Sequence, residues 1–408
     1  MSKIAVLGHG VVGSGTVELF LKNRENINKR NGIDLELGYV LDIRDFEGLS
    51  YSDKFTKDIN DILNDPEVTV VAEVMGGVNP AFDFVKSCLE KGKSVATSNK
   101  ELVAKKGAEL LKVAKEHNCN FMFEASTGGA IPIIRPMHKC LAGNEITAVA
   151  GILNGTTNFI LTKMIEENMA FDDALSMAQK LGYAEKDPTA DIEGHDACRK
   201  ICILSSLAYG RHVYPDWVHC EGITKLTLED VAYAQNWGGE IKLIGSVKKC
   251  DDGKILPMVR PAFVCSGNQL SHVDDVFNAI MVYGDGFDQA MFYGRGAGKL
   301  PTASAVLGDI IDCAKLTETS KSQYWEDSAD DSFIMNYLDD QVQMYVRVDN
   351  VSDADINAEF GQVEYLDRDN KPANEKAFIT SKLSEREIQT KLEKFGKNVL
   401  AFIRVLDF

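Results

Sequence analysis

A glycine motif near the start of the chain is the first candidate for a binding site. Gly8, Gly10 and Gly13 have the spacing G-x-G-x-x-G, and Val11 and Val12 stand between the last two. Such glycines make a tight turn, let the backbone approach a pyrophosphate and let a helix pack closely on a strand. The free N–H groups at the start of the following helix would bind the phosphates. Because an apolar strand precedes the pattern and a helical pattern follows it, the motif predicts a dinucleotide site.

Two charged residues after the second expected strand could distinguish NAD from NADP. Asp42 could accept a hydrogen bond from the ribose 2′-hydroxyl group, which favours NAD. Arg44 could instead bind a 2′-phosphate group, which favours NADP. Residues 25–34 form an insertion that lengthens the usual distance between the glycines and this acid. An ordinary surface loop would carry the same two residues, so the sequence leaves the choice of dinucleotide open.

One carboxylate and two lysines form a second group of residues that could take part in catalysis. Asp196 and Lys200 have i,i+4 spacing, and Lys100 follows the end of an expected strand. Spacing alone favours a surface ion pair worth about 0.3 kcal/mol. Hydride transfer at an alcohol carbon, however, must be matched by proton movement on its oxygen. A lysine can exchange that proton if burial or a nearby cation lowers its pKa.

The elements that would position these groups begin with alternating strands and helices. Strands are expected at residues 4–7, 35–41, 69–74, 94–97 and 120–124, and helices at 14–23, 80–91 and 100–117. Alternation of apolar strands with helices predicts a parallel sheet covered on both faces. The first part of the chain is therefore expected to be an α/β Rossmann domain that binds NAD(P).

The pattern changes to α+β after residue 128. Strands are expected at 145–153, 259–265 and 289–293, helices at 158–181, 190–209 and 227–237, and a helix at 302–316 would return to the first domain. After an acidic linker, 317–331, strands at 343–348, 361–366, 376–380 and 399–405 and a helix at 384–395, with a short helix after the first strand, follow a ferredoxin-like βαββαβ order. We expect three domains: residues 1–128 with 302–320, residues 129–301, and residues 335–408.

Composition limits the classes of partner. The net charge is −17, from 61 acidic and 44 basic residues, which disfavours nucleic acid and anionic membranes. No apolar run reaches the roughly 18 residues that a membrane span needs. The nine cysteines have no metal-binding spacing, and we expect reduced packing residues in a cytoplasmic protein with a small-molecule substrate.

Seven ordered segments resemble one enzyme family. LGYAEKDPTADIEGHDACRK at 181–200 closely resembles the signature of homoserine dehydrogenases. The glycine loop at residue 8, EVMGG at 73–77, SNK at 98–100, EASTGGAIP at 124–132, GILNGTTN at 151–158 and GRGAGKLPT at 294–302 agree with it. The resemblance spans roughly residues 1–320. It implies reversible, NAD(P)-dependent interconversion of L-homoserine and L-aspartate 4-semialdehyde, a reaction of threonine and methionine biosynthesis.

The resemblance also implies roles for single residues. Lys200 is then the proton donor and acceptor, and Lys100 is a second catalytic lysine near the nicotinamide, with Asp196 beside them. Glu185 would bind the substrate's ammonium group in a desolvated pocket, and Asp191 would be a second acidic contact.

Two further positions complete the expected substrate and cofactor sites. Thr156 is expected at the substrate and Gly298 at the dinucleotide. His195 is given no role and is expected to be a satisfied structural histidine.

A monovalent cation, Na⁺ or K⁺, is a further implication of the resemblance. The side chain of Glu124 and the carbonyl groups of Thr127, Gly129 and Ile131 would bind it, and an oxygen-only set suits a hard ion. The sequence departs from the family at two places in this loop: Thr127 replaces a common valine and Ala130 a common glycine. The second change predicts a more restricted backbone.

The C-terminal unit resembles an ACT regulatory domain. Such domains often bind an amino acid at a D-x-x-G turn after the first strand, and here that turn reads Asp349-Asn350-Val351-Ser352, without glycine. A ligand-free oligomerisation module and a feedback sensor both stay open, and a homodimer or homotetramer is expected.

Two other function classes explain part of the sequence. An aldehyde-oxidising semialdehyde dehydrogenase would need a nucleophilic cysteine, and none stands in a recognisable setting. A protein that only senses NAD(P) would not need Glu185, Asp196, Lys100 and Lys200 together.

Overall fold

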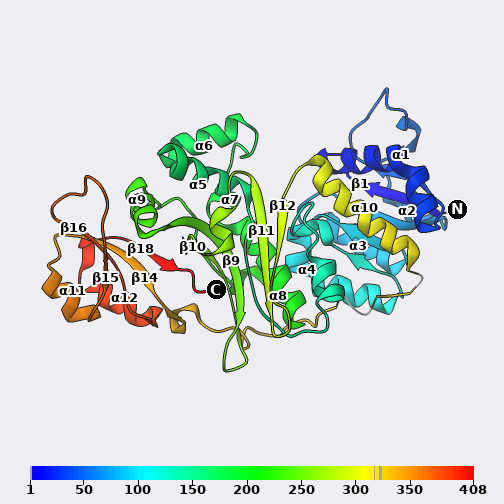
Figure 1. Cartoon of the computed structure of the whole chain (residues 1–408). Helices are drawn as coiled ribbons and strands as arrows, with labels where there is room; N and C mark the ends of the chain where they lie inside the picture. Colours follow the sequence, from blue (N-terminus) through cyan, green and yellow to red (C-terminus); the bar gives the residue numbers. More distant parts are fainter. Residues whose placement is uncertain (1, 317, 321–323) are drawn as a thin grey trace.

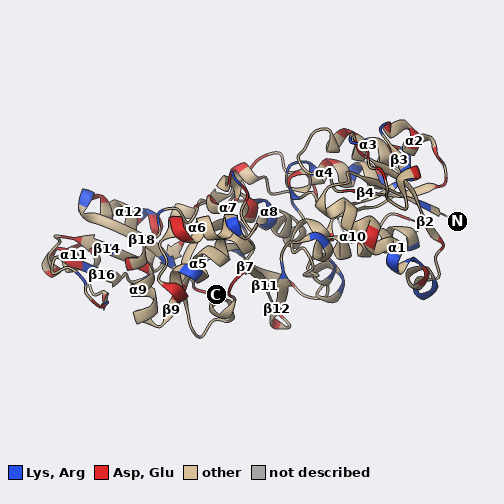
Figure 2. Ribbon diagram, turned by 90° about the horizontal axis from the view of Figure 1, so that it is seen from above, with Lys and Arg blue, Asp and Glu red and all other residues tan. Residues whose placement is uncertain are grey.

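The computed structural model describes residues 2–316, 318–320 and 324–408. The molecule is elongated (Figure 1). An N-terminal sheet with its helices lies at one end, the C-terminal unit lies at the other end, and antiparallel strands and helices lie between them. Acidic and basic side chains are distributed over all three parts (Figure 2).

The N-terminal sheet confirms the predicted Rossmann arrangement. Its six strands are all parallel and have the order β3-β2-β1-β4-β5-β6. The order reverses between β1 and β4, and ligands bind at the carboxyl ends of strands beside such a switch point. The strands are β1 (Ser2–Leu7), β2 (Leu35–Leu41), β3 (Phe55–Thr56), β4 (Val68–Glu73), β5 (Ser94–Thr97) and β6 (Phe121–Met122).

Helices cover both faces of this sheet, and the first is longer than the sequence suggested. Helix α1 runs from Val11 to Asn31 and ends at Gly32, whose φ is 64°. Most of residues 25–34, which we interpreted as an insertion, therefore continues the helix. Helix α10 (Lys299–Lys315) packs against α1, as Figure 1 shows. The other helices are α2 (Ile59–Asn64), α3 (Ala81–Glu90) and α4 (Lys100–Glu116).

The central part is built on an antiparallel sheet whose strands were only partly predicted. The sequence analysis missed β9 (Gly239–Lys249) and β11 (Phe277–Gly284), which occupy the middle of the order β12-β11-β7-β9-β10. Both are nearly buried throughout. Strand β11 is mainly apolar and lacks the polar alternation that marks a half-exposed strand, whereas β9 has such an alternation, at Glu240, Lys242, Ser246 and Lys248, which the sequence analysis did not use. The remaining strands are β7 (Ile146–Ile152), β10 (Ile255–Cys265) and β12 (Asp288–Arg295).

Two long helical stretches of the central part are each interrupted. The first is broken after Asn168, which adopts φ 51°, and the second at Gly194, with φ 81°. Left-handed residues of this kind end a helix and redirect the chain. The resulting helices are α5 (Gly155–Glu167), α6 (Phe171–Lys180), α7 (Thr189–Ile192) and α8 (His195–Tyr209), followed by α9 (Leu228–Trp237).

The C-terminal unit has the predicted ferredoxin-like order, but its sheet is not separate. The strands are arranged β18-β14-β16-β15, and β18 also pairs in parallel with β10 of the central sheet. One continuous sheet of ten strands therefore joins the two parts. The elements are β14 (Met344–Asp349), α11 (Asp353–Phe360), β15 (Glu364–Leu366), β16 (Glu375–Ile379), α12 (Glu385–Glu393) and β18 (Val399–Val405). Short strands β13 (Gln341–Val342) and β17 (Leu383–Ser384) pair beside it, and β8 (His219–Cys220) pairs with β10.

The nine cysteines are all free, as expected for a reduced protein. Their expected packing role holds for the five buried ones only, because Cys140 and Cys265 are exposed and Cys220 and Cys250 are partly exposed. In the part of the chain that the structure describes, no helix is long and apolar enough to cross a membrane.

Candidate active site

The glycine loop between β1 and α1 has the geometry that a dinucleotide phosphate needs. Gly8 adopts φ 96°, and a Cβ on Gly13 would lie 2.0 Å from the Gly8 carbonyl oxygen. Space around Gly10 is open, and no side chain caps the N-terminus of α1. The first N–H groups of α1 are therefore free to bind an anion. The loop fits the pyrophosphate of NAD(P).

Asp42 and Arg44, the two candidates for reading the 2′ position, contact each other beside this loop. Nε and Nη2 of Arg44 each donate to the Asp42 carboxylate at 2.9 Å, and the His9 N–H donates to it at 2.7 Å. The Arg44 guanidinium holds the pKa of Asp42 well below its usual range. The Arg44 side chain is 58% exposed and that of Asp42 only 7%. A ligand would therefore reach the arginine first.

Both lysines meet the carboxylate of Asp196, which the sequence had paired with Lys200 alone. Asp196 lies in the first turn of α8, and its Oδ2 is 2.8 Å from Nζ of Lys200 one turn later. Its Oδ1 is 2.8 Å from Nζ of Lys100, the first residue of α4. Lys200 also donates to the carbonyl oxygen of Leu153 at 2.5 Å. The predicted i,i+4 pair is thus present, and it is buried rather than exposed.

The two lysines differ in their electrostatic surroundings. Burial lowers the pKa of Lys200, and the charge of Lys100 lowers it further, although Asp196 opposes both effects. The charge of Asp196 raises the pKa of Lys100, whose side chain remains 41% exposed. Burial acts to raise the pKa of Asp196, but the two ammonium groups outweigh it and keep that carboxyl ionised. Burial raises the pKa of the nearby Asp191.

Asn154 is a site residue that the sequence analysis did not identify. Its Nδ2 donates to Asp191 at 2.7 Å and to Asp196 at 2.9 Å, so it holds the two carboxylates together. Its Oδ1 accepts from the N–H of Thr157 at 2.8 Å and so caps α5. An asparagine just before a helix signals the cap, but its second role depends on residues about forty positions away.

A cleft of about 640 Å³ separates the N-terminal sheet from the central part and contains most of the predicted residues. No cysteine is among its lining residues in the described chain, which removes the basis for an aldehyde-oxidising enzyme with a cysteine nucleophile. The predicted residues that line it are Val11, Val12, Lys100, Thr127, Thr156, Glu185, Asp191, Asp196, Lys200 and Gly298. Gly8, Gly10, Gly13, Asp42, Arg44, Glu124, Gly129 and Ile131 lie outside the lining set of described residues.

Two expectations about this cleft are wrong. Glu185 is exposed rather than desolvated, because it belongs to the surface loop between α6 and α7. The side chain of His195 is also exposed and forms no hydrogen bond to a described residue, so it is not a satisfied structural histidine. The cleft also contains Arg295, and Asn278, whose side-chain amide is buried and unpaired within the described residues. Arg295 belongs to the GRGAGKLPT segment at 294–302 but was given no role, and none of the seven segments contains Asn278.

The loop after β6 contains the residues that were expected to bind the cation. Oε1 of Glu124 accepts the N–H groups of Ile133 and Ile134 at 2.6 and 2.8 Å, and Oε2 accepts that of Arg135 at 2.9 Å. Its carboxylate is therefore already engaged by the backbone. Within the described chain, the carbonyl groups of Thr127, Gly129 and Ile131 accept no hydrogen bond. Gly129 has φ 57°, whereas Ala130 is outside the left-handed region, so alanine there introduces no strain.

Comparisons with known proteins agree with this arrangement. A family model described as homoserine dehydrogenase matches residues 132–311, and one described as the homoserine dehydrogenase NAD binding domain matches residues 8–124. The chain is 40% identical over 317 residues to the homoserine dehydrogenase of Bacillus subtilis and 42% identical over 317 residues to that of Neisseria gonorrhoeae. Each alignment covers 77% of this chain and 73% of the relative.

Solved structures extend the similarity over the C-terminal unit. A homoserine dehydrogenase from Thiobacillus denitrificans has a TM-score of 0.90 at 33% identity and covers all of this chain and 98% of its own. The S. aureus homoserine dehydrogenase at pH 7.5 has a TM-score of 0.83 at 34% identity, with 100% and 99% covered. A hyperthermophilic archaeal homoserine dehydrogenase mutant in complex with NADPH has a TM-score of 0.65 at 28% identity and covers 76% of this chain and 97% of its own.

Proposed function

The chain belongs to the homoserine dehydrogenase family, and we propose that Lys200 is the residue that exchanges a proton with the substrate oxygen. The chain is an NAD(P)-dependent oxidoreductase that acts on a CH–OH group and interconverts L-homoserine and L-aspartate 4-semialdehyde. The bound dinucleotide supplies or accepts the hydride. The free N–H groups at the start of α1 would hold its pyrophosphate.

The difference between the two lysines carries this proposal. Lys200 is 6% exposed and burial lowers its pKa, whereas Asp196 keeps Lys100 a stable cation. A group whose pKa approaches the working pH is the better acid and base. The Lys200 ammonium would give a proton to the oxygen when the semialdehyde is reduced, and its neutral amine would accept one when homoserine is oxidised. Lys100 would stabilise negative charge that develops on the same oxygen.

The substrate's ammonium group would bind at the acidic side of the cleft. Asp191 and Glu185 both line the cleft, and Asp191 is the more buried of the two. We propose Asp191 as the closer partner and Glu185 as a partner at the rim. The hydroxyl of Thr156 donates to the Tyr183 carbonyl oxygen at 2.8 Å and links α5 to the loop that carries Glu185.

A monovalent cation would bind through main-chain oxygens. The uncommitted carbonyl groups of Thr127, Gly129 and Ile131 are hard ligands suited to Na⁺ or K⁺. The carboxylate of Glu124 would act at longer range, because it already accepts three backbone N–H groups. Bound there, the ion would stiffen the loop of which Thr127 lines the cleft.

We also propose a division of the chain into three domains. Residues 1–128 with 302–320 would form the dinucleotide domain, residues 129–301 the catalytic and dimerisation domain, and residues 335–408 the ACT-like domain. We also propose a homodimer or homotetramer in the cytoplasm, and its nine free cysteines suit a reducing compartment.

A spectrophotometric assay with L-homoserine and either NAD or NADP tests the function. We expect reduced nicotinamide to appear with at least one dinucleotide when Na⁺ or K⁺ is present. No turnover with either dinucleotide, in a sample that circular dichroism shows to be folded, would refute it.

A further inference from the structure

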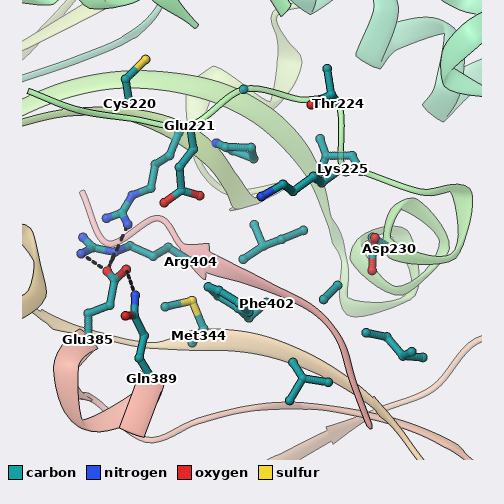
Figure 3. A pocket seen from close by; sticks show the side chains of 18 of the residues that line it. Cys220, Glu221, Thr224, Lys225, Asp230, Met344, Glu385, Gln389, Phe402 and Arg404 are labelled. Atoms are coloured by element: carbon teal, nitrogen blue, oxygen red, sulfur yellow. Dashed lines mark hydrogen bonds and ion pairs between the residues drawn. The ribbon is translucent and has the colours of Figure 1, made fainter. Parts of the chain in front are cut away.

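The buried carboxylates of the described chain share a feature that only one of them lacks. Seven of the eight form an ion pair with a lysine or an arginine. Figure 3 shows one such pair, in which the carboxylate of Glu385 lies against the guanidinium of Arg404. Glu73 is 0% exposed and forms no ion pair with any described residue. A buried charge without a counter-ion is costly, and such exceptions are expected at functional sites. The eight are Glu73, Glu124, Asp196, Asp230, Asp309, Asp340, Glu375 and Glu385.

Glu73 lies where a Rossmann sheet binds its ligand. It is the last residue of β4, and the strand order reverses between β4 and β1. The turn that follows it touches the glycine loop, because a Cβ on Gly8 would lie 2.8 Å from Cγ of Met75. Ligands of such sheets bind at the carboxyl ends of the strands beside the reversal. Within the described chain Glu73 does not itself line the catalytic cleft, so it can act on the reaction only through its neighbours.

Hydrogen-bond donors replace the missing counter-ion. The N–H of Met75 donates to Oε1 of Glu73 at 2.8 Å, and the hydroxyl of Thr97 donates to Oε2 at 2.7 Å. Oγ1 of Thr97 accepts the N–H of Asn99 at 2.9 Å, so its own proton is free for Glu73. A set of donors fits an ionised carboxylate, which only accepts. Burial raises the pKa of Glu73, and these hydrogen bonds act to lower it.

Asn99 connects this network to the turn after β4 and to the start of α4. Its Nδ2 donates to the carbonyl oxygen of Gly77 at 2.6 Å, and its Oδ1 accepts the N–H of Leu102 at 3.1 Å. Gly76 and Gly77 are exposed and have φ of 86° and 72°. Because glycine is conformationally permissive, the turn depends on its anchors at Glu73 and Asn99.

The same network determines where α4 begins, and with it the position of Lys100. Lys100 is the first residue of α4, and its Nζ lies 2.8 Å from Oδ1 of Asp196. Thr97 ends β5, and its hydrogen bond to Glu73 ties that strand end to β4. Since two residues separate Thr97 from Lys100, a displacement of this strand end would move Lys100 relative to α8.

We propose that Glu73 is a positioning residue, which acts through Thr97 and Asn99. It holds Lys100 beside Asp196 and the turn after β4 against the glycine loop. Its loss should therefore weaken dinucleotide binding and release Lys100 from its ion pair. The part of the inference that concerns proton transfer rests on the proposed function.

Two variants break the network at different points. Glu73→Gln keeps the shape of the side chain but directs an amide N–H group at a donor, and Thr97→Val removes the linking hydroxyl. Dinucleotide fluorescence should give a Kd at least about tenfold higher in each variant. Glu90→Gln and Thr69→Val, at exposed positions of α3 and β4, are the matched controls and should leave the Kd unchanged. An unchanged Kd in both network variants would overturn the role in dinucleotide binding.

Acetylation of Lys100 by acetic anhydride, followed by mass spectrometry, tests its position without requiring turnover. Asp196 raises the pKa of Lys100, and only a neutral amine reacts. Loss of the ion pair should therefore speed the acetylation of Lys100 by at least about twofold in both variants. Lys112, an exposed lysine of the same helix, is the internal reference. Equal rates in the variants and the unaltered chain would refute the positioning of Lys100.

The pH profile of kcat for homoserine oxidation tests the consequence for Lys200. The charge of Lys100 and burial lower the pKa of Lys200, whereas Asp196 and Asp191 raise it. When Lys100 moves away, the pKa of Lys200 should rise. The increase of kcat with pH should then shift to higher pH in both network variants, in the same direction as in Lys100→Met. Variants that lose only stability in urea, with an unshifted profile and an unchanged Kd, would show a purely structural role and overturn the proposal.

The outcomes separate this inference from the proposed function. If Lys200→Met keeps the rise of kcat with pH, another group exchanges the proton, and the Kd and the acetylation rate still decide the role of Glu73. If Glu73→Gln does not fold, Thr97→Val provides each of the three measurements.

Discussion

The sharpest prediction concerns Lys200, whose replacement by methionine keeps most of the apolar stem and removes the transferable proton. General acid–base catalysis contributes about 10²–10⁴ in rate, so we expect kcat for homoserine oxidation to fall by that factor. The variant also leaves the carbonyl oxygen of Leu153 without its donor at 2.5 Å and removes one of the two ammonium partners of Asp196. An unsatisfied buried group costs about 1–3 kcal/mol of stability.

Three measurements separate these effects. Steady-state kinetics give kcat, dinucleotide fluorescence gives the Kd, which we expect to be nearly unchanged, and urea unfolding gives the stability. The pH profile adds a fourth test. Oxidation requires the neutral amine of Lys200, and the pKa of this group is lowered by burial. In the unaltered enzyme kcat should therefore rise with pH, over a lower range than an ordinary lysine would give, and this rise should be absent from Lys200→Met.

Lys200→Arg is the matched control. Its guanidinium keeps a positive charge and hydrogen-bond donors near Asp196 but does not lose its proton at working pH. We expect a kcat as low as that of Lys200→Met, with a smaller loss of stability. Near-normal turnover of Lys200→Met, or a loss caused only by failure to bind the dinucleotide, would refute the reasoning and favour Lys100.

The other predictions follow from the cofactor loop, the cation loop and the C-terminal turn. Arg44→Ala should weaken NADP more than NAD, because a phosphate contact is lost; equal changes in the two KM values would contradict this. Replacing Na⁺ and K⁺ by choline should lower kcat/KM, whereas Thr127→Val should leave it within about twofold because only the carbonyl is a ligand; an unchanged rate in choline would argue against the ion. L-Threonine should inhibit homoserine oxidation weakly or not at all, because the turn from Asp349 to Ser352 lacks glycine. Saturable inhibition at sub-millimolar threonine, lost when residues 335–408 are deleted, would show the opposite.

Local sequence patterns were sufficient to predict those features that depend only on residues close together in the chain. The strands at 35–41, 94–97 and 399–405 have the predicted bounds, and the glycine loop stands in the predicted place. In the same way, i,i+4 spacing anticipated the contact between Asp196 and Lys200, since a helix brings such residues together wherever it lies. The buried strand β11 was missed because a mainly apolar run does not distinguish strand from helix, whereas β9 carries a polar alternation that the sequence analysis did not use.

Distant contacts determined the chemistry of the site. Spacing alone favours a surface ion pair for Asp196 and Lys200, and only the family resemblance indicates a catalytic pair. Only the packing of α4 and α8 brings Lys100 to the same carboxylate, and only the position of Asn154 joins Asp191 to it. These residues are too far apart in the sequence for a periodic pattern to predict their contacts.

The sequence by itself therefore determined the family resemblance and the Rossmann order, and it supplied the candidate catalytic side chains, because each depends on short, ordered motifs. The tertiary structure decided which lysine is buried and which carboxylates are exposed. These properties depend on which surfaces exclude water, and that follows from how whole elements pack against one another. Lys200 shows the distinction: its identity is local, but its lowered pKa results from burial by residues distant in the sequence.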